Sequence, residues 1–413
     1  ANNANNGYGY GIFVQTKAYA TPSTCYAGTL TMTGGTVNVV SDRTKAAELP
    51  NYGIYINTKV ASVGVDKTAT DGTKSEKASA AASIENATIN VTSGTNNSYG
   101  VMARGSYNSY DKTYRKSTIK NSIINVKANT NAYGVYADAV INSSTYAYGA
   151  HAGKIELTGN NNITATTTGK NAYGVYVHAA SNATAVDVVA AEVEITSGTY
   201  KAIAANTTAY AVHSAPKQTQ GEKEEAPSIT INGGKFWAEA SSTYADISSV
   251  CVPGYCVITG GYYKTNANVS SVLQEGYNIF PLQQNKAEHK DAYNEGYRWH
   301  VTNNFTGEAV WEVFNNTNTL LGTFDNLNSA LDFAKDKTNN KVVPTTNYTL
   351  PAGEYTIPIG VTLLIPYDDA YTVEKDNHVY AEAPAVTSRK VSPYRTLTLD
   401  SGVKINVNGD IVV

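Results

Sequence analysis

The stretch Tyr52-Gly53-Ile54-Tyr55 recurs along the first two-thirds of the chain and decides its fold. It returns as Tyr99-Gly100-Val101-Met102, Tyr133-Gly134-Val135-Tyr136, Tyr173-Gly174-Val175-Tyr176 and, in altered form, Tyr210-Ala211-Val212-His213. The first tyrosines of successive copies lie 47, 34, 40 and 37 residues apart. Because a period of roughly 20 to 50 residues is typical of stacked repeats, the sequence predicts a solenoid and not a globular enzyme domain.

A second pattern lies between the copies of the first and predicts short strands. Its copies occupy residues 30–39, 84–91, 119–126, 155–157, 193–200 and 229–236, where apolar and polar residues alternate and β-branched residues are frequent. Two strand patterns per period predict two rungs of roughly 17 to 24 residues each. We therefore predict a right-handed parallel β-helix, with the hand that parallel crossovers almost always take.

The repeats predict two domains. Residues 1–301 form a parallel β-helix repeat domain, which ends in a closing segment with larger aromatic residues. Apolar residues at helical spacing over 324–335, with Asp325 or Asn326 as the N-cap, predict one short α-helix. Such a helix covers the open end of an apolar stack. We therefore expect residues 302–413 to be a helix-capped second β-solenoid unit that is cut short at Val413.

The composition indicates where the protein works and which partners it lacks. Only 16% of its 413 residues are charged, whereas tyrosine occurs 31 times, a balance that favours an extracellular or cell-surface protein. The net charge of −3 offers no basic surface for nucleic acid. The sequence has no apolar run of membrane-spanning length and no signal-peptide pattern. We expect no membrane span, and we interpret the chain as a processed product or a piece of a longer one.

The run from Gly260-Gly261 through Glu275-Gly276-Tyr277 to Trp299-His300-Val301, with residues 353–366 and 395–409, carries a family resemblance. It resembles secreted parallel β-helix repeat proteins on the surface of gut-type anaerobic bacteria, which are adhesin-like and have a pectate-lyase-type solenoid. The resemblance implies surface display with adhesion or scaffolding, and it transfers no catalytic residue. It implies as partners other copies of the chain, neighbouring domains of a longer surface protein, or glycans. We therefore expect a non-enzymatic module without cofactors, which could assemble end to end into a fibre.

The alternative function is a carbohydrate-binding or polysaccharide-degrading β-helix. Such lyases and hydrolases need carboxylates gathered on one exposed sheet. The adjacent pair Asp368-Asp369 follows Pro366 and is interpreted as a turn, whereas Asp138 and Asp187 do not share a position in the repeat. The sequence thus predicts no catalytic residue. The alternative, in contrast, predicts a groove with converging Asp and Arg side chains.

One position of the repeat is a candidate binding surface. Three residues after the first tyrosine stand Tyr55, Met102, Tyr136, His151 (counted from Tyr148), Tyr176 and His213. Equivalent residues of a parallel solenoid stack about 4.8 Å apart per coil. If Val135 and Val175 are internal, alternation makes this ladder face outward, where it can stack on sugars or contact proteins. The other interpretation is that tyrosine simply favours and stabilises strands.

Cysteine and histidine give one further prediction. Cys251 and Cys256 enclose a Pro253-Gly254 turn, a spacing that allows a local disulfide, with free thiols as the alternative. Cys25 is left over. We predict no metal site, because no further Cys or His pair supplies ligands and several rungs separate the histidines of the repeat.

Overall fold

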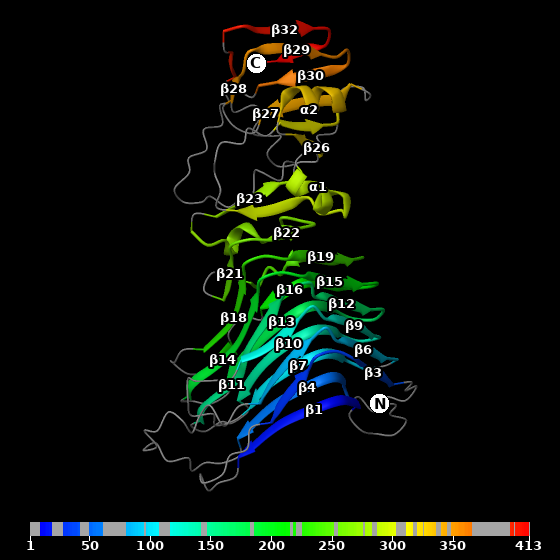
Figure 1. Cartoon of the computed structure of the whole chain (residues 1–413), viewed down its shortest axis with the longest axis vertical. Coiled ribbons are helices and arrows are strands. Elements are labelled where there is room, and N and C mark those ends of the chain that lie inside the picture. The colour runs from blue at the N-terminus through cyan, green and yellow to red at the C-terminus, as the bar shows by residue number, and fades with distance from the viewer. Residues whose placement is uncertain are drawn as a thin grey trace. The chain divides into compact units, whose positions relative to one another are not determined.

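A computed structural model of the chain describes residues 9–18, 28–41, 49–60, 80–94, 96–106, 116–141, 147–181, 186–214, 218–219, 225–251, 255–275, 277–282, 287–302, 311–316, 320–324, 326–335, 340–344, 348–365, 397–399 and 401–412. The chain folds as two compact units, residues 1–277 and 278–413. Figure 1 shows the stacked strands of both units.

The first unit is an all-β solenoid of three parallel sheets. The chain passes through one strand of each sheet in turn, and each strand pairs in parallel with its equivalent in the next coil. This arrangement confirms the predicted parallel β-helix; its right-handedness stays a prediction.

The strands of the first unit belong to three sheets, named here first, second and third. The first sheet contains β1 (Gly9–Ala18), β4 (Asn51–Val60), β7 (Ser98–Ser106), β10 (Ala132–Ile141), β13 (Ala172–Ser181), β16 (Thr208–Ser214) and β20 (Thr243–Ile247), with β17 (Gln218–Thr219) beside β13. The second contains β2 (Thr29–Met32), β5 (Ala81–Glu85), β8 (Lys116–Lys120), β11 (Ala147–Thr158), β14 (Val186–Ile195), β18 (Glu225–Ile231) and β21 (Cys256–Ile258). The third contains β3 (Thr36–Ser41), β6 (Thr88–Ser93), β9 (Ile123–Ala128), β12 (Asn162–Thr167), β15 (Thr199–Ala204), β19 (Lys235–Ala240) and β22 (Tyr262–Tyr263), and a short 3-10 helix, η1 (Ser270–Val272), follows.

Each period of the sequence is one coil of three strands, so the prediction of two rungs per period was wrong. The sequence pattern over residues 84–91 is two strands, β5 and β6, that meet at a corner. Asn86 turns this corner with a φ of 53°, and Asn121 turns the equivalent corner of the next coil with a φ of 48°. Asparagine tolerates this left-handed backbone better than most residues, and alternation of apolar residues alone does not reveal such a corner.

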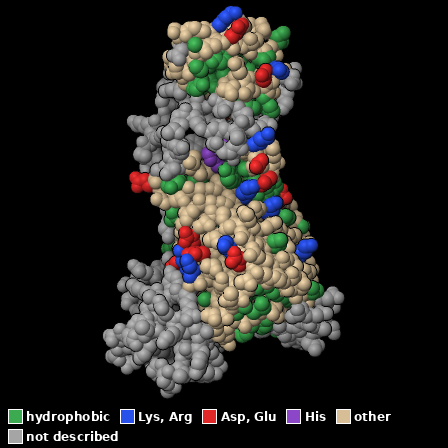
Figure 2. Space-filling model, viewed as in Figure 1, with side chains coloured by type: hydrophobic (Ala, Val, Ile, Leu, Met, Phe, Trp, Pro, Cys, Tyr) green, Lys and Arg blue, Asp and Glu red, His purple; other side chains and the backbone are tan. Residues whose placement is uncertain are grey.

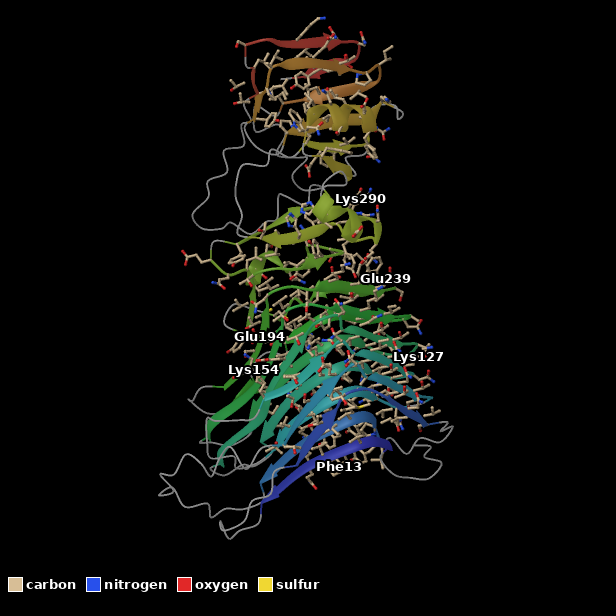
Figure 3. All side chains as sticks on the ribbon, viewed as in Figure 1. Phe13, Lys127, Lys154, Glu194, Glu239 and Lys290 are labelled. Atoms are coloured by element: carbon tan, nitrogen blue, oxygen red, sulfur yellow. The ribbon has the colours of Figure 1, made fainter. Side chains whose placement is uncertain are left out.

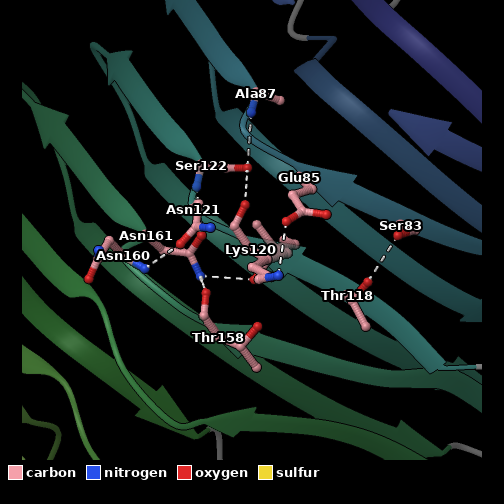
Figure 4. Close-up of polar contacts among 11 residues, drawn as sticks. Ser83, Glu85, Ala87, Thr118, Lys120, Asn121, Ser122, Thr158, Asn160 and Asn161 are labelled. Carbon is pink, nitrogen blue, oxygen red and sulfur yellow. Dashed lines mark hydrogen bonds and ion pairs between the residues drawn. The ribbon is translucent and has the colours of Figure 1, made fainter. Parts of the chain in front are cut away.

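Polar side chains tie the corners of neighbouring coils together (Figure 4). The Ala87 amide donates to Ser122 Oγ over 3.2 Å, and the Ser122 amide donates to Asn161 Oδ1 over 2.9 Å. Asn161 Nδ2 in turn donates to the carbonyl oxygens of Ile119 and Thr158, each over 2.9 Å. Backbone groups at these corners therefore find partners in the next coil, which a buried turn requires.

The core consists of columns of like side chains that stack from coil to coil. In the second sheet, Ile84, Ile119 and Leu157 occupy equivalent positions and are almost completely buried. In the third sheet the inner column changes from aliphatic to aromatic: it continues from Ile163 into Tyr200, Phe236 and Tyr263, which have no exposed surface. The rings of Tyr200 and Phe236 stack with centroids 5.3 Å apart.

The second unit combines antiparallel strands, two short helices and a smaller set of parallel strands. Its elements are β23 (Asn278–Pro281), α1 (Ala287–Asn294), β24 (Trp299–Thr302), β25 (Trp311–Phe314), β26 (Leu320–Phe324), α2 (Leu327–Ala334), β27 (Asn340–Pro344), β28 (Tyr348–Leu350), β29 (Gly353–Ile357), β30 (Val361–Leu364), β31 (Leu397–Leu399), β32 (Val403–Val407) and β33 (Asp410–Val412). Three parallel sets, β27-β30-β33, β28-β31 and β29-β32, form the predicted second solenoid.

Helix α2 confirms the predicted capping helix. Asn326 is its N-cap, and Asn326 Oδ1 accepts from the Ser329 amide over 2.8 Å. The helix buries Ala330 and Leu331 in a core that includes Trp311. Helix α1 was not predicted, because its sequence is polar and carries no apolar stripe. The two compact units meet after residue 277, inside the closing segment of residues 260–301, whereas the sequence places its domain boundary after residue 301.

Charged side chains of the first unit pair across coils. In the second sheet, Lys116 Nζ lies 2.7 Å from Glu156 Oε2, and Lys154 forms an ion pair with Glu194 beside it (Figure 3). On the face drawn in Figure 2, charged side chains form small groups of mixed sign on a surface of uncharged atoms. These ion pairs link side chains of neighbouring strands in the second sheet.

Candidate functional site

The repeated tyrosines lie on the outer face of the first sheet, and a bend in each strand brings them together. In β10, a Cβ atom on Gly134 would lie only 2.4 Å from Cγ2 of the buried Ile163, so Gly134 points into the core. The next residue, Val135, is also fully buried. Two successive inward residues interrupt the strand alternation, and both Tyr133 and Tyr136 are therefore outward.

These tyrosines form two columns of rings that run along the coils. Within the first column, the ring centroids of Tyr52 and Tyr99 are 5.0 Å apart, those of Tyr99 and Tyr133 4.7 Å, and those of Tyr133 and Tyr173 5.1 Å. Rings also stack between columns, as Tyr52 does on Tyr55 at 4.7 Å. The first column is Tyr10, Tyr52, Tyr99, Tyr133, Tyr173 and Tyr210, and the second column is Phe13, Tyr55, Met102, Tyr136, Tyr176 and His213.

The ring faces in these columns pack against neighbouring rings of the same protein. Tyr99 lies nearly parallel to Tyr52 on one side and to Tyr133 on the other, with interplanar angles of 15° and 4°. Tyr52 and Tyr99 expose only 6% and 8% of their surface. Burial raises the pKa of Tyr99 to about 12, so its hydroxyl stays protonated. Because both faces of Tyr99 are covered by neighbouring rings, this part of the ladder has no face to offer a sugar.

The structure places five of the six predicted ladder residues in one column. Tyr55, Met102, Tyr136, Tyr176 and His213 occupy equivalent positions in the first sheet, although Tyr55 and Met102 are almost buried. The sixth, His151, was assigned wrongly: it lies in β11 of the second sheet, opposite Ala190. The tyrosine-glycine pattern that precedes His151 resembles the repeat, but the pattern does not say which of three strands in a coil carries it.

The second column ends in His213, which stacks on a tyrosine and contacts a serine hydroxyl. The ring of His213 stacks on Tyr176 with centroids 4.6 Å apart, and His213 Nδ1 lies 2.9 Å from Ser248 Oγ. Burial, and to a smaller extent His178, lowers the pKa of His213 to about 4. The imidazole is therefore neutral at physiological pH and continues the column as an uncharged aromatic ring.

A third column, two residues beyond the second, is polar and was missed in the sequence. Its members are Gln15, Asn57, Arg104, Asp138 and His178, which pair in register across five coils. The Asp138 carboxylate accepts from His178 Nδ1 over 2.9 Å and lies 3.4 Å from Arg104 Nε. The sequence did contain a signal for this column, because each of its residues stands two positions after a member of the second column. From the sequence, Asp138 was compared only with Asp187, whereas the structure gives Asp138 two ionisable neighbours, Arg104 and His178.

The two cysteines meet in the core but are not bonded. Cys251 and Cys256 are free and buried, at 1% exposure each. A thiol–thiol hydrogen bond lowers the pKa of Cys251 and raises that of Cys256, burial adding to the second shift. Cys251 Sγ also accepts from the Ser214 amide over 3.2 Å. The predicted partners are adjacent, and the disulfide itself stays a prediction; Cys25 lies outside the described residues.

Other predicted features concern catalysis, metals and membranes. Asp368 and Asp369 lie outside the described residues. Within the part of the chain that the structure describes, no group of three or more His, Cys, Asp or Glu side chains could hold a metal ion. Among the same residues, neither helix has the length and apolar character needed to cross a membrane. Comparison of the chain with protein-family models, with curated proteins and with solved structures finds no match.

Proposed function

We propose that the chain is a non-enzymatic structural module of an extracellular surface protein, in which a regular solenoid supports adhesion or display. The observation that carries the proposal is the continuity of its side-chain ladders. Two columns of side chains, aromatic at every position except Met102, span six coils of the first sheet. A parallel column of amides joins Asn38, Asn90 and Asn125 in the third sheet, with hydrogen bonds of 2.9 and 3.0 Å.

Such ladders stabilise contacts between neighbouring coils. Each coil of a solenoid contacts only its neighbours, so overall stability is a sum over coil interfaces. Stacked aromatic rings and amide ladders strengthen every one of these interfaces in the same way. A module with this construction is suited to hold its form outside a cell, where it meets proteases and changing conditions.

The enzymatic alternative has weaker support. Its expected sign was a convergence of Asp and Arg, and Arg104 does approach Asp138. These two charges neutralise each other, and the carboxylate is only 7% exposed. A pair held in this way adds to the contacts between coils and leaves Asp138 poorly placed to meet a substrate.

The test combines turnover, protease resistance and self-association. Purified chain is incubated with pectate, alginate, xylan and mannan, and we expect no new reducing ends and no unsaturated products. Proteinase K should leave a resistant fragment that contains the coils of the first unit. Electron microscopy of the concentrated chain then distinguishes a fibre-forming module from one that stands alone. Cleavage of any of the four polysaccharides, abolished by Asp138→Asn, would refute the proposal.

A further inference from the structure

The outer face of the third sheet carries an excess of positive charge, although the chain as a whole has a net charge of −3. In strands β6, β9, β12, β15, β19 and β22, buried residues alternate with residues that point outward. Lys127 and Glu239 project on the same side of the first unit in Figure 3. The charged residues at the outward positions of these strands, together with Lys264 directly after β22, are Lys127, Lys201, Lys235, Lys264 and Glu239.

Two of these lysines keep their charge unpaired. Lys127 is exposed and Lys201 is partly buried, and neither forms an ion pair with any residue that the structure describes. The second sheet is different, because Lys116 and Lys120 lie 2.7 and 2.9 Å from glutamate oxygens of neighbouring strands. The lysines of the second sheet are therefore neutralised within the fold, whereas Lys127 and Lys201 are left to attract a partner from outside it.

The indole of Trp237 positions two of the lysines. Lys201 is its cross-strand neighbour in the preceding coil, and Lys264 lies in the following coil. Lys264 Nζ is 4.1 Å and Lys201 Nζ 5.7 Å from the centroid of the indole ring, distances at which an ammonium group is attracted to an aromatic face. Glu239 Oε1 also accepts from Lys264 Nζ over 2.5 Å. The ring thus holds the protein's own lysines, and this part of the face presents ammonium groups to a partner.

The lysines recur at a regular interval along the stack. Lys127, Lys201 and Lys264 lie in every second coil, with β12 and β19 in the coils between them. Because neighbouring parallel strands are about 4.8 Å apart, the lysines follow one another at about 10 Å along the stack. Outward threonines such as Thr164 and Thr166 occupy the coil between the first two lysines. The face is therefore a row of spaced cations with neutral hydroxyl groups between them.

We propose that the outer face of the third sheet binds a linear polysaccharide with spaced acidic groups, which Lys127, Lys201 and Lys264 contact. An extended polymer lying along the stack meets an ammonium group at every second coil, and the threonine hydroxyls between can donate to and accept from sugar hydroxyls. Nucleic acid fits this face less well. Duplex DNA carries one charge per ~1.7 Å, far more densely than the lysines are spaced, and single strands need open aromatic platforms, whereas lysines cover Trp237. The proposal goes beyond the structural function and does not depend on it.

The experiment measures binding to the whole chain by isothermal titration calorimetry at ~10 mM salt, where charges are least screened. The probes are decasaccharides of hyaluronan, with one carboxylate per disaccharide, and of chondroitin sulfate, which adds a sulfate. Neutral xylohexaose and decathymidylate are the comparisons. We expect at least one acidic decasaccharide to bind with a Kd of ~1 mM or tighter and to weaken at ~150 mM salt. No binding of either acidic probe overturns the proposal, as does tighter binding of xylohexaose or decathymidylate.

Variants test whether the third sheet carries the binding. The double variant Lys127→Gln/Lys201→Gln removes two charges without breaking an ion pair, and we expect it to weaken binding about tenfold with an unchanged melting temperature. Lys116→Gln/Lys120→Gln is the matched control, because it changes the net charge equally on the second sheet; its affinity should fall less than about twofold. Glu239→Gln removes the acidic group of the face and should tighten binding.

Two outcomes contradict the proposal and leave the proposed function intact. The first is an affinity that is the same in Lys127→Gln/Lys201→Gln and in the unaltered chain. The second is an equal loss of affinity in both double variants, which would mean that the probe responds only to net charge. Cleavage of a bound decasaccharide, in contrast, would keep the site and refute the non-enzymatic function.

Discussion

Replacing Tyr133 by alanine tests whether the aromatic columns hold the solenoid together. Among the described residues its ring has four aromatic neighbours, with centroids 4.7 Å away at Tyr99, 5.1 Å at Tyr136, 5.1 Å at Tyr173 and 5.4 Å at Tyr176. At ~0.5 to 1.5 kcal/mol for each aromatic pair, four pairs amount to about 2 to 6 kcal/mol. Independently, truncation of a large buried aromatic side chain to alanine typically lowers the free energy of unfolding by about 3 to 5 kcal/mol. We expect the free energy of unfolding to fall by about 4 kcal/mol.

The assay is guanidinium unfolding followed by circular dichroism, with hydrogen exchange to localise the effect. Exchange should rise most in β7, β10 and β13, because a solenoid coil contacts only its neighbours. Tyr133→Phe keeps the ring and should cost less than about 1 kcal/mol. Tyr244→Ala removes a tyrosine that is 47% exposed and should also cost less than about 1 kcal/mol. If Tyr133→Ala lowers the free energy of unfolding no more than Tyr244→Ala does, the rings do not stabilise the contacts between coils, and the structural interpretation of the columns fails.

Three further perturbations probe the bend, a buried acid and the cysteines. Gly134→Ala places a methyl group 2.4 Å from Ile163 Cγ2 and should cost about 3 kcal/mol in guanidinium unfolding; full native stability would show that the bend relaxes freely. Burial raises the pKa of Asp246 to about 7, although backbone hydrogen bonds act to lower it. Because the unfolded carboxyl titrates near pH ~4, the stability that protonated Asp246 contributes is fully present below pH ~4 and is lost as the pH rises to ~7. Melting from pH 4 to 8 should therefore decline less in Asp246→Asn, and parallel profiles would contradict the assignment. Oxidation of Cys251 and Cys256 by a small disulfide closes a six-residue loop, worth about 2 kcal/mol; mass spectrometry should find this bond, and a pairing with Cys25 instead would contradict the observed contact.

The fold was largely predictable because it depends on periods that are local in sequence. Apolar residues at alternate positions gave the inward columns, as Ile84 and Ile119 show by being almost completely buried at equivalent places. The helical spacing and Asn326 located α2 for the same reason. The number of strands per coil was not predictable in this way. A corner such as Asn86 changes the direction of the chain without breaking the apolar pattern.

The candidate site was predictable only in part. The sequence placed Tyr136 and Tyr176 on one column, since both stand at the same position of the repeat. It could not show that Tyr133 turns to the same side, because that depends on Gly134 and Val135 both pointing inward. Nor could it show that Arg104 reaches Asp138, which is 34 residues away in sequence and adjacent only through strand register.

The sequence by itself determined the repeating coil, the inward aliphatic residues and the short helix, because each follows from spacing within one strand or one turn of helix. Only the tertiary structure decided which residues of different coils are neighbours. Register between strands 34 to 47 residues apart stacks Tyr52 on Tyr99, separates His151 from the tyrosine columns and leaves Asn57 beside Arg104. The physical reason is that alternation along a strand determines which face of the sheet a side chain occupies, whereas backbone pairing between coils determines which side chains lie next to it.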